Sequence, residues 1–136
     1  MIQFDVKQEE LERRRELATH ARQLLSENLQ IVAEDETSIM TCYHNFYVQI
    51  SFSEMHPLLV IYFARELNSS KLKKKTLLNT LNLKSVLGSH SVNEAVGCYT
   101  FRATIWMDTE LQCDRFYEIF DRCADEACRG FEKMAG

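Results

Sequence analysis

Residues 69–88 read SSKLKKKTLLNTLNLKSVLG, and they divide the chain into two strand-rich halves. Leu72, Leu78 and Leu81 recur at the spacing of an amphipathic helix, whose lysines can face water. Serines at the start suit an N-cap, and Gly88 suits the left-handed turn that follows a helix. The stretch therefore predicts a helix over 69–88, with three strands before it and two after it.

Composition indicates a soluble globular protein. The chain has 136 residues, of which 46% are hydrophobic and 26% are charged, so it suits a single domain over 1–136. A net charge of −4 argues against non-specific binding to nucleic acid. No apolar run approaches the roughly 20 residues that span a bilayer, and residues 1–6 do not resemble a signal peptide. We therefore expect a cytoplasmic protein without membrane contact.

Cysteines and motifs give no sign of catalysis. The five cysteines are odd in number and form no CxxC pair, which indicates thiols in a reducing compartment and neither disulfides nor a metal site. The sequence lacks GxGxxG, P-loop, GxSxG, HExxH and EF-hand motifs. We therefore predict no catalytic residue, no cofactor and no metal ligand, and we expect that the protein is not an enzyme.

The first half begins with a helical pattern and continues with strands. Residues 7–28 carry an apolar stripe among charges of both signs, which predicts a long helix. Residues 31–33 could end that helix or begin a strand. Residues 39–43 are strand-like, and 46–53 alternate apolar and polar side chains, as in a half-buried antiparallel strand.

The run from Leu58 to Phe63 is apolar on both faces of a strand. Such a strand needs cover on two sides, by a helix on one and by a partner or another element on the other. We accordingly predict that one set of its alternating side chains contacts a partner: Leu59, Ile61 and Phe63.

The second half closes with a hairpin and a helix. Residues 98–107 alternate, so that Tyr99 and Phe101 face the core while Arg102 and Trp106 share the opposite face. Because Trp and Arg are frequent anchors at protein interfaces, Arg102 and Trp106 are added to the predicted partner site. Residues from about 108 onward repeat apolar side chains every 3.6 residues, which predicts a long final helix.

These elements follow the order α-β-β-β-α-β-β-α, which predicts an α+β fold in which helices flank an antiparallel sheet of about five strands. The order, the run Leu77-Leu78-Asn79-Thr80-Leu81-Asn82 and the closing strand and acidic helix resemble the YbjN-like group, labelled as bacterial sensory transduction regulators. That group shares the fold of the type III secretion chaperones. The resemblance implies a non-catalytic, often dimeric protein-binding or regulatory domain, which holds a partner protein at a sheet edge or groove.

Two other functions remain open from the residues. A pocket between the sheet and the helices could bind a small molecule or catalyse a reaction. Alternatively, the lysine-rich central helix could bind nucleic acid, although the overall charge disfavours this. The lysines in question are Lys71, Lys73, Lys74, Lys75 and Lys84.

Overall fold

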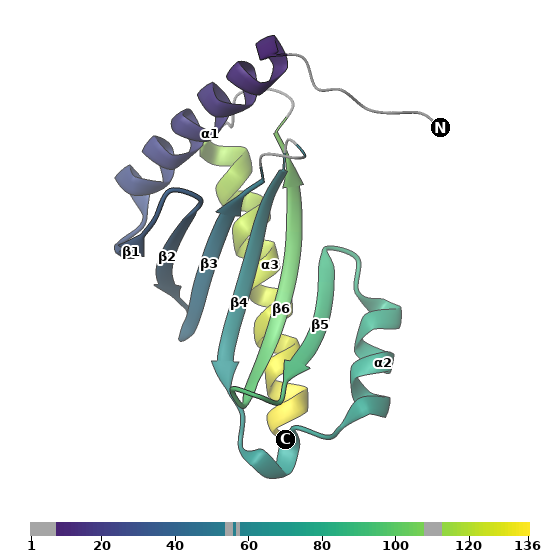
Figure 1. Ribbon diagram of the computed structural model, residues 1–136. Coiled ribbons are helices and arrows are strands. Elements are labelled where there is room, and N and C mark those ends of the chain that lie inside the picture. The colour runs from purple at the N-terminus through teal and green to yellow at the C-terminus, as the bar shows by residue number, and fades with distance from the viewer. Residues whose placement is uncertain (1–7, 54–55, 57, 108–112) are drawn as a thin grey trace.

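The computed structural model describes residues 8–53, 56, 58–107 and 113–136. Its strands form one antiparallel sheet in the order β1-β2-β3-β4-β6-β5, flanked by helices (Figure 1). In chain order the elements are helix α1 (Gln8–Asn28), strands β1 (Ile31–Glu34), β2 (Ser38–Tyr43), β3 (Phe46–Phe52) and β4 (Leu58–Glu66), the 3-10 helix η1 (Ser69–Lys71), helix α2 (Lys75–Lys84), strands β5 (Gly88–Asn93) and β6 (Cys98–Trp106), and helix α3 (Cys113–Ala135).

The α+β architecture expected from the sequence is confirmed, with one strand more than expected. The ambiguous segment at 31–33 forms β1, which pairs with β2, so the sheet has six strands. Two hairpin connections, between β2 and β3 and between β5 and β6, contain residues with positive φ. His44 and Asn45 have φ values of 50° and 66°, and Gly97 has a φ of 68°, all in the left-handed region that short hairpin turns require.

The central helix is shorter than the sequence predicts. Residues 69–71 form η1, whose N-cap is Asn68 and not a serine, and α2 spans only Lys75–Lys84. Gly88 opens β5 instead of following a helix. A Cβ at Gly88 would lie 2.2 Å from the carbonyl oxygen of Arg102, so close pairing with β6 requires glycine there. A glycine is therefore needed at position 88, but for close pairing of β5 with β6 and not for ending a helix.

One face of the sheet carries the core. Helix α3 runs along this face, behind the strands in Figure 1, and α1 adds buried residues at the β1–β3 end. Aromatic rings from the strands and α3 pack on each other, with Phe63 5.5 Å from Phe120 and 5.9 Å from Phe46 between ring centroids. Helix α2 lies beyond β5, at the other end of the sheet, and none of its residues is fully buried.

Candidate protein-binding surface

No helix of the described residues covers the second face of the sheet (Figure 1). On the central strands β4 and β6, Leu58 stands opposite Trp106 and Tyr62 opposite Arg102. The Arg102 guanidinium lies 5.7 Å from the centre of the Tyr62 ring, a cation–π arrangement. Large apolar side chains on this face are exposed, with Trp106 at 66% and Tyr62 at 38%. Tyr47 on β3 and Met40 on β2 extend the exposed set.

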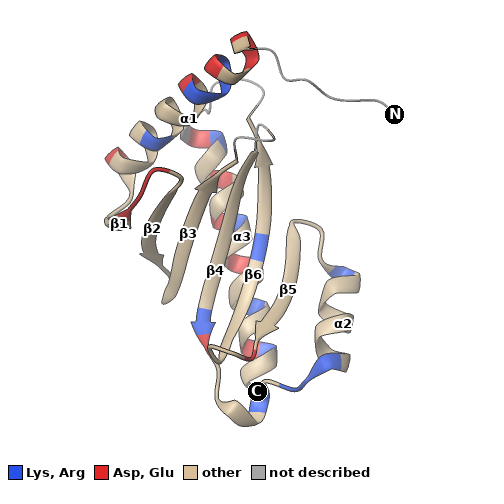
Figure 2. Cartoon of the chain, in the orientation of Figure 1, with Lys and Arg blue, Asp and Glu red and all other residues tan. Residues whose placement is uncertain are grey.

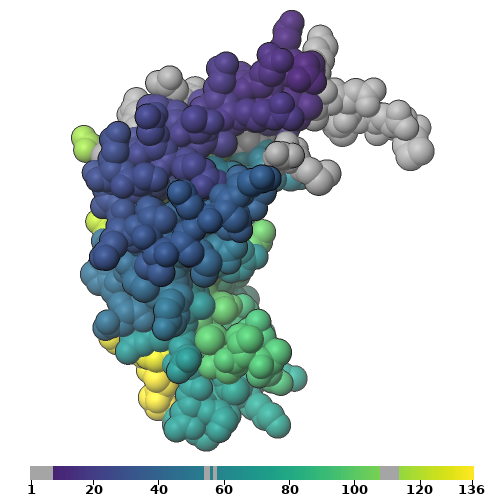
Figure 3. Space-filling model, turned by 60° about the vertical axis from the view of Figure 1, so that its left-hand side comes forward, coloured from purple at the N-terminus to yellow at the C-terminus, as the bar shows by residue number. Residues whose placement is uncertain are grey.

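We call this the open face, defined by Met40, Tyr47, Tyr62, Arg102 and Trp106. Figure 3 shows in profile that it is hollowed between α1 at one end and β5 at the other. It also carries little charge: among the described residues of β2 to β6, the register places one cation, Arg102, and one anion, Glu66 at the end of β4, on this side. Figure 2 shows few charged positions along these strands. A hollow, neutral and aromatic surface suits an apolar partner better than a charged polymer.

The structure divides the site that the sequence predicts. Leu59, Ile61 and Phe63 are each 0% exposed and belong to the core beneath α3, so in this conformation they cannot meet a partner. Arg102 and Trp106 lie on the open face, as expected. Because Leu58–Phe63 is apolar on both sides, its sequence does not tell which side α3 covers.

Sequence reasoning missed part of the open face. Tyr62, Tyr47 and Met40 were not assigned to a partner site. Strand pairing places these residues on one face. Tyr62 lies opposite Arg102 and, on its other side, opposite Gln49. Gln49 in turn lies opposite Met40, and Tyr47 points the same way because it is two residues from Gln49. Using this pairing as a signal requires the strand order, which brings β6 next to β4 although α2 and β5 separate them in the chain.

Each edge of the sheet carries a feature that disfavours pairing with an added strand. At the β5 edge, the Asn82 side chain accepts from the His90 backbone N–H at 2.7 Å and donates to the His90 carbonyl at 2.9 Å. The amide therefore occupies the groups that an added strand would use. At the other edge, β1 has four residues and a register shift between Ile31 and Ala33. Short and irregular edge strands resist strand addition.

A buried polar cluster joins α2, β5, β6 and α3. His90 is 4% exposed, its Nδ1 lies 2.6 Å from the Tyr99 hydroxyl, and its Nε2 lies 3.8 Å from a Glu126 carboxylate oxygen. Burial lowers the pKa of His90 below its usual value, although Glu126 opposes the shift. The Ser85 hydroxyl lies within donating distance of two acceptors, the Gly88 carbonyl oxygen at 2.6 Å and a Glu126 carboxylate oxygen at 2.5 Å. The cluster links the end of α2 to β5 and α3 through Ser85, Asn82 and Glu126.

The titratable groups show no activated nucleophile among the described residues. Burial raises the pKa of Cys98 and Cys128, and raises that of Cys123 to about 11, so these thiols stay protonated at neutral pH. Burial and a hydrogen bond to the Asp121 carboxylate raise the pKa of Tyr43 to about 12. No group of three metal-ligating side chains occurs in the described ranges. No helix within those ranges is long and apolar enough to span a bilayer.

Comparison with known proteins identifies the fold. The chain is similar to E. coli YbjN, described as a suggested transcription regulator, with a TM-score of 0.64 and 9% identity over 83% of this chain and 87% of that one. It is also similar to a chain of the HopA1–SchA chaperone–effector complex, with a TM-score of 0.62 and 17% identity over 94% and 99%. No family model and no curated protein sequence matches the chain. The chain thus has the YbjN-like, chaperone-like fold that its sequence resembles.

Proposed function

We propose that this chain is a non-catalytic protein-binding module that holds a segment of a partner protein on the open face. The observation that supports this most is the exposure of Trp106, Tyr62, Tyr47 and Met40 on one side of a sheet whose other side carries the buried core. Exposed apolar side chains gathered on one surface are typical of interaction sites. Trp, Tyr and Arg, which meet at Trp106, Tyr62 and Arg102, are the residues most often found as interface hot spots.

Charge favours a polypeptide over nucleic acid as the partner. Phosphate-binding surfaces need several cations, and the open face offers Arg102 alone among its described strand residues. The five lysines of the central stretch lie elsewhere, around η1 and α2 beyond β5 (Figure 2). The fold neighbour that comes from a chaperone–effector complex supports a protein partner in the same way.

The second part of the proposal is a homodimer formed through α2. Leu83 is 87% exposed and Val86 is 90% exposed, and both stand at the end of a helix that buries no residue fully. Burying such side chains against a second copy is favourable by roughly 1.5–3 kcal/mol each. Light scattering of the purified protein tests this: the expected mass is twice 15.9 kDa, and a monomer mass at working concentration contradicts the dimer.

The partner itself is tested by capture followed by direct binding. Affinity purification from the source cells should recover one dominant protein with the wild-type chain. The Trp106→Ala chain should lose that protein, while Thr104→Ala, a neighbouring exposed change on β6, should retain it. Because Trp106 is the one tryptophan in the sequence, its emission reports on the open face. Adding the recovered protein should shift that emission to shorter wavelength, as expected when an exposed indole becomes buried.

Three results would count against the open face. Equal recovery with Trp106→Ala and Thr104→Ala would place the contact elsewhere. An unchanged emission spectrum in a formed complex would show that Trp106 stays in water. Retardation of DNA or RNA at low salt, lost steeply as salt is raised, would favour the lysine-rich helix and a nucleic-acid function.

A further inference from the structure

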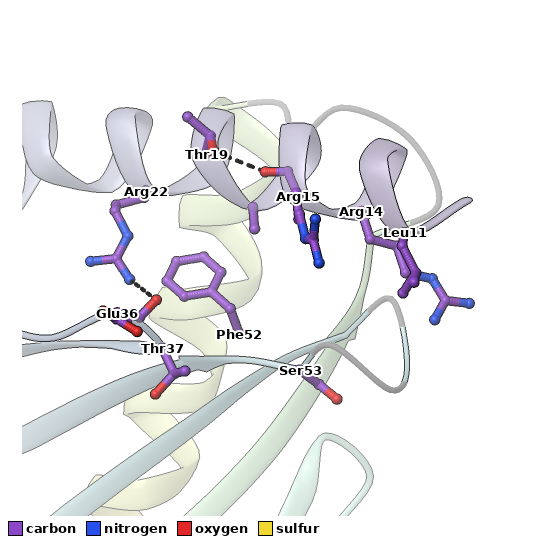
Figure 4. Close-up of a pocket in the computed structure, with 10 residues that line it drawn as sticks. Leu11, Arg14, Arg15, Thr19, Arg22, Glu36, Thr37, Phe52 and Ser53 are labelled. Atoms are coloured by element: carbon purple, nitrogen blue, oxygen red, sulfur yellow. Dashed lines mark hydrogen bonds between the residues drawn. The ribbon is translucent and has the colours of Figure 1, made fainter. Parts of the chain in front are cut away.

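A separate cavity lies between α1 and the end of the sheet. Its volume is about 320 Å³, at the lower end of the range for small-molecule sites. It lies on the helix side of the sheet, since Phe52 at its base follows Val48 and Ile50, which face the core. Figure 4 shows α1 above the cavity and the strands below it. The open face and this cavity are therefore different surfaces.

Arg15 gives the cavity a cation whose guanidinium has no partner among the described residues. Its guanidinium points from α1 toward the strands in Figure 4 and makes no ion pair or hydrogen bond with any described residue. The neighbouring arginine on α1 is different: Arg14 is paired with Glu10 at 3.2 Å. An unpaired guanidinium beside a cavity favours an anion, for which it supplies charge-assisted hydrogen bonds.

Arg22 and Phe52 form the opposite wall of the cavity. Arg22 is held by the Glu34 carboxylate at 3.1 Å and by the Glu36 carbonyl at 3.0 Å. Its guanidinium lies 5.0 Å from the centre of the Phe52 ring. These contacts fix the Phe52 ring as a flat apolar wall before any ligand arrives, and a preordered wall reduces the entropy that binding must overcome.

The remaining lining distinguishes an organic anion from a bare inorganic one. Leu11 and Ala18 from α1 face the cavity together with Phe52, so apolar and cationic groups share a small space. The acidic Glu36 and three hydroxyl side chains complete the lining, and Glu36 lies on the side of Arg22, whose guanidinium binds its carbonyl oxygen. Inorganic phosphate would satisfy Arg15 but would leave these apolar groups against water. A carboxylate on a ring-sized apolar body would satisfy both.

We propose that this cavity is a binding site for a small organic anion, with its carboxylate on Arg15 and its apolar body against Phe52. The site adds a ligand-responsive element to the chain, and it does not depend on the partner-binding function of the open face. Bound ligand would tie α1 to the strands at a place where the first turns of α1 bury no side chain fully.

The probe for the test is 1-naphthoate, measured by equilibrium dialysis and by its fluorescence with the full chain. We expect saturable binding at one site per chain, weakened about tenfold or more by Arg15→Gln, which equals about 1.4 kcal/mol or more. Arg13→Gln is the matched control, because Arg13 is on the same helix, is exposed and does not line the cavity. Circular dichroism of both variants should match the wild type, since both arginines are exposed.

Neutral and inorganic probes complete the test. 1-Naphthamide should bind at least tenfold more weakly than 1-naphthoate, and inorganic phosphate should compete only weakly. Equal binding of the amide would overturn the role of Arg15, and strong competition by phosphate would overturn the role of Phe52. Equal loss in Arg13→Gln and Arg15→Gln, or no saturable binding of naphthoate, would remove the proposed site. Binding of an acidic peptide without binding of naphthoate would assign the cavity to a protein partner instead.

Discussion

The two faces of strand β4 differ in burial although their sequences are almost equally apolar. Phe63 is 0% exposed beneath α3, while its neighbour Tyr62 is 38% exposed on the open face. Burial of an apolar side chain stabilises the fold only when another element covers it, and α3 covers one side alone. The comparison teaches that apolar side chains on the open face contribute little to folding, and that their presence there fits a role in binding.

Phe63→Ala and Tyr62→Ala measure this difference on one strand. Phe63→Ala should lower the free energy of unfolding by about 3–5 kcal/mol, because it leaves a cavity among packed rings. Tyr62→Ala should lower it by about 1 kcal/mol or less, since it removes an exposed ring and its contact with Arg102. Urea unfolding followed by circular dichroism gives both values. Equal losses would mean that the open face is covered in the isolated protein.

The elements of this fold follow from local patterns, whereas the division between the faces does not. Alternation at 46–53 and 98–107 predicted β3 and β6, and the periodicity after residue 108 predicted α3. The start of that last helix was expected near residues 108–109, which lie outside the described residues. No local sequence pattern shows that Leu59, Ile61 and Phe63 are on the side of β4 that α3 covers. Strand order and the position of α3 decide it, and both are long-range properties.

The candidate sites depend even more on distant contacts. That Arg102 and Trp106 share one face could be predicted because their alternation is visible in the sequence, and their role in binding stays a prediction. In the sequence, Arg15 is one of the charges of the predicted helix at 7–28, and Phe52 is one of the alternating side chains of the predicted strand at 46–53. Their shared cavity exists only because α1 crosses the end of the sheet. The end of the helix predicted over 69–88 was wrong for a similar reason, because Gly88 is required by its close approach to the Arg102 backbone on β6.

Gly130→Ala tests how closely α3 approaches the covered face. A Cβ at Gly130 would lie too close to the Tyr99 hydroxyl oxygen and to the His90 ring, so either α3 or these two side chains would have to move. We expect a loss of about 1–3 kcal/mol in urea unfolding, as for overpacking in other cores. A comparable exchange in the same protein, Glu132→Ala, adds no atoms near this cluster and should cost little. A neutral Gly130→Ala would show that the two layers are not in close contact there.

Asn82→Ala tests how α2 covers β5, the edge strand of the sheet. The variant loses both hydrogen bonds to the His90 backbone, and their joint contribution is about 1–2 kcal/mol. Hydrogen exchange should accelerate at His90 and through α2, while the central strands β3 and β4 keep their protection. Asn79→Ala, one turn earlier on α2, is the control and should change neither. Unchanged exchange at His90 in Asn82→Ala would mean that α2 does not close the β5 edge.

Mild acid should weaken the covered side without affecting the open face. His90 has a lowered pKa, so the folded protein binds fewer protons at this site than the unfolded chain, whose His titrates near 6.5. Its contribution is therefore fully present above about pH 6.5 and is lost as pH falls toward the folded pKa. The Glu126 carboxylate opposes this loss but does not reverse its direction. Urea midpoints should consequently fall from pH 7.5 to pH 5.5.

His90→Gln separates this group from the other histidines. The variant keeps a polar side chain beside Tyr99 but cannot gain a proton, so its urea midpoint should change less between pH 7.5 and 5.5 than that of the wild type. Asp35, whose pKa is lowered chiefly by the backbone N–H of Thr37, titrates below this range and does not contribute. Identical pH slopes in the two proteins would show that His90 is already solvated, and that the polar cluster beneath α3 is as open to water as Trp106 on the opposite face.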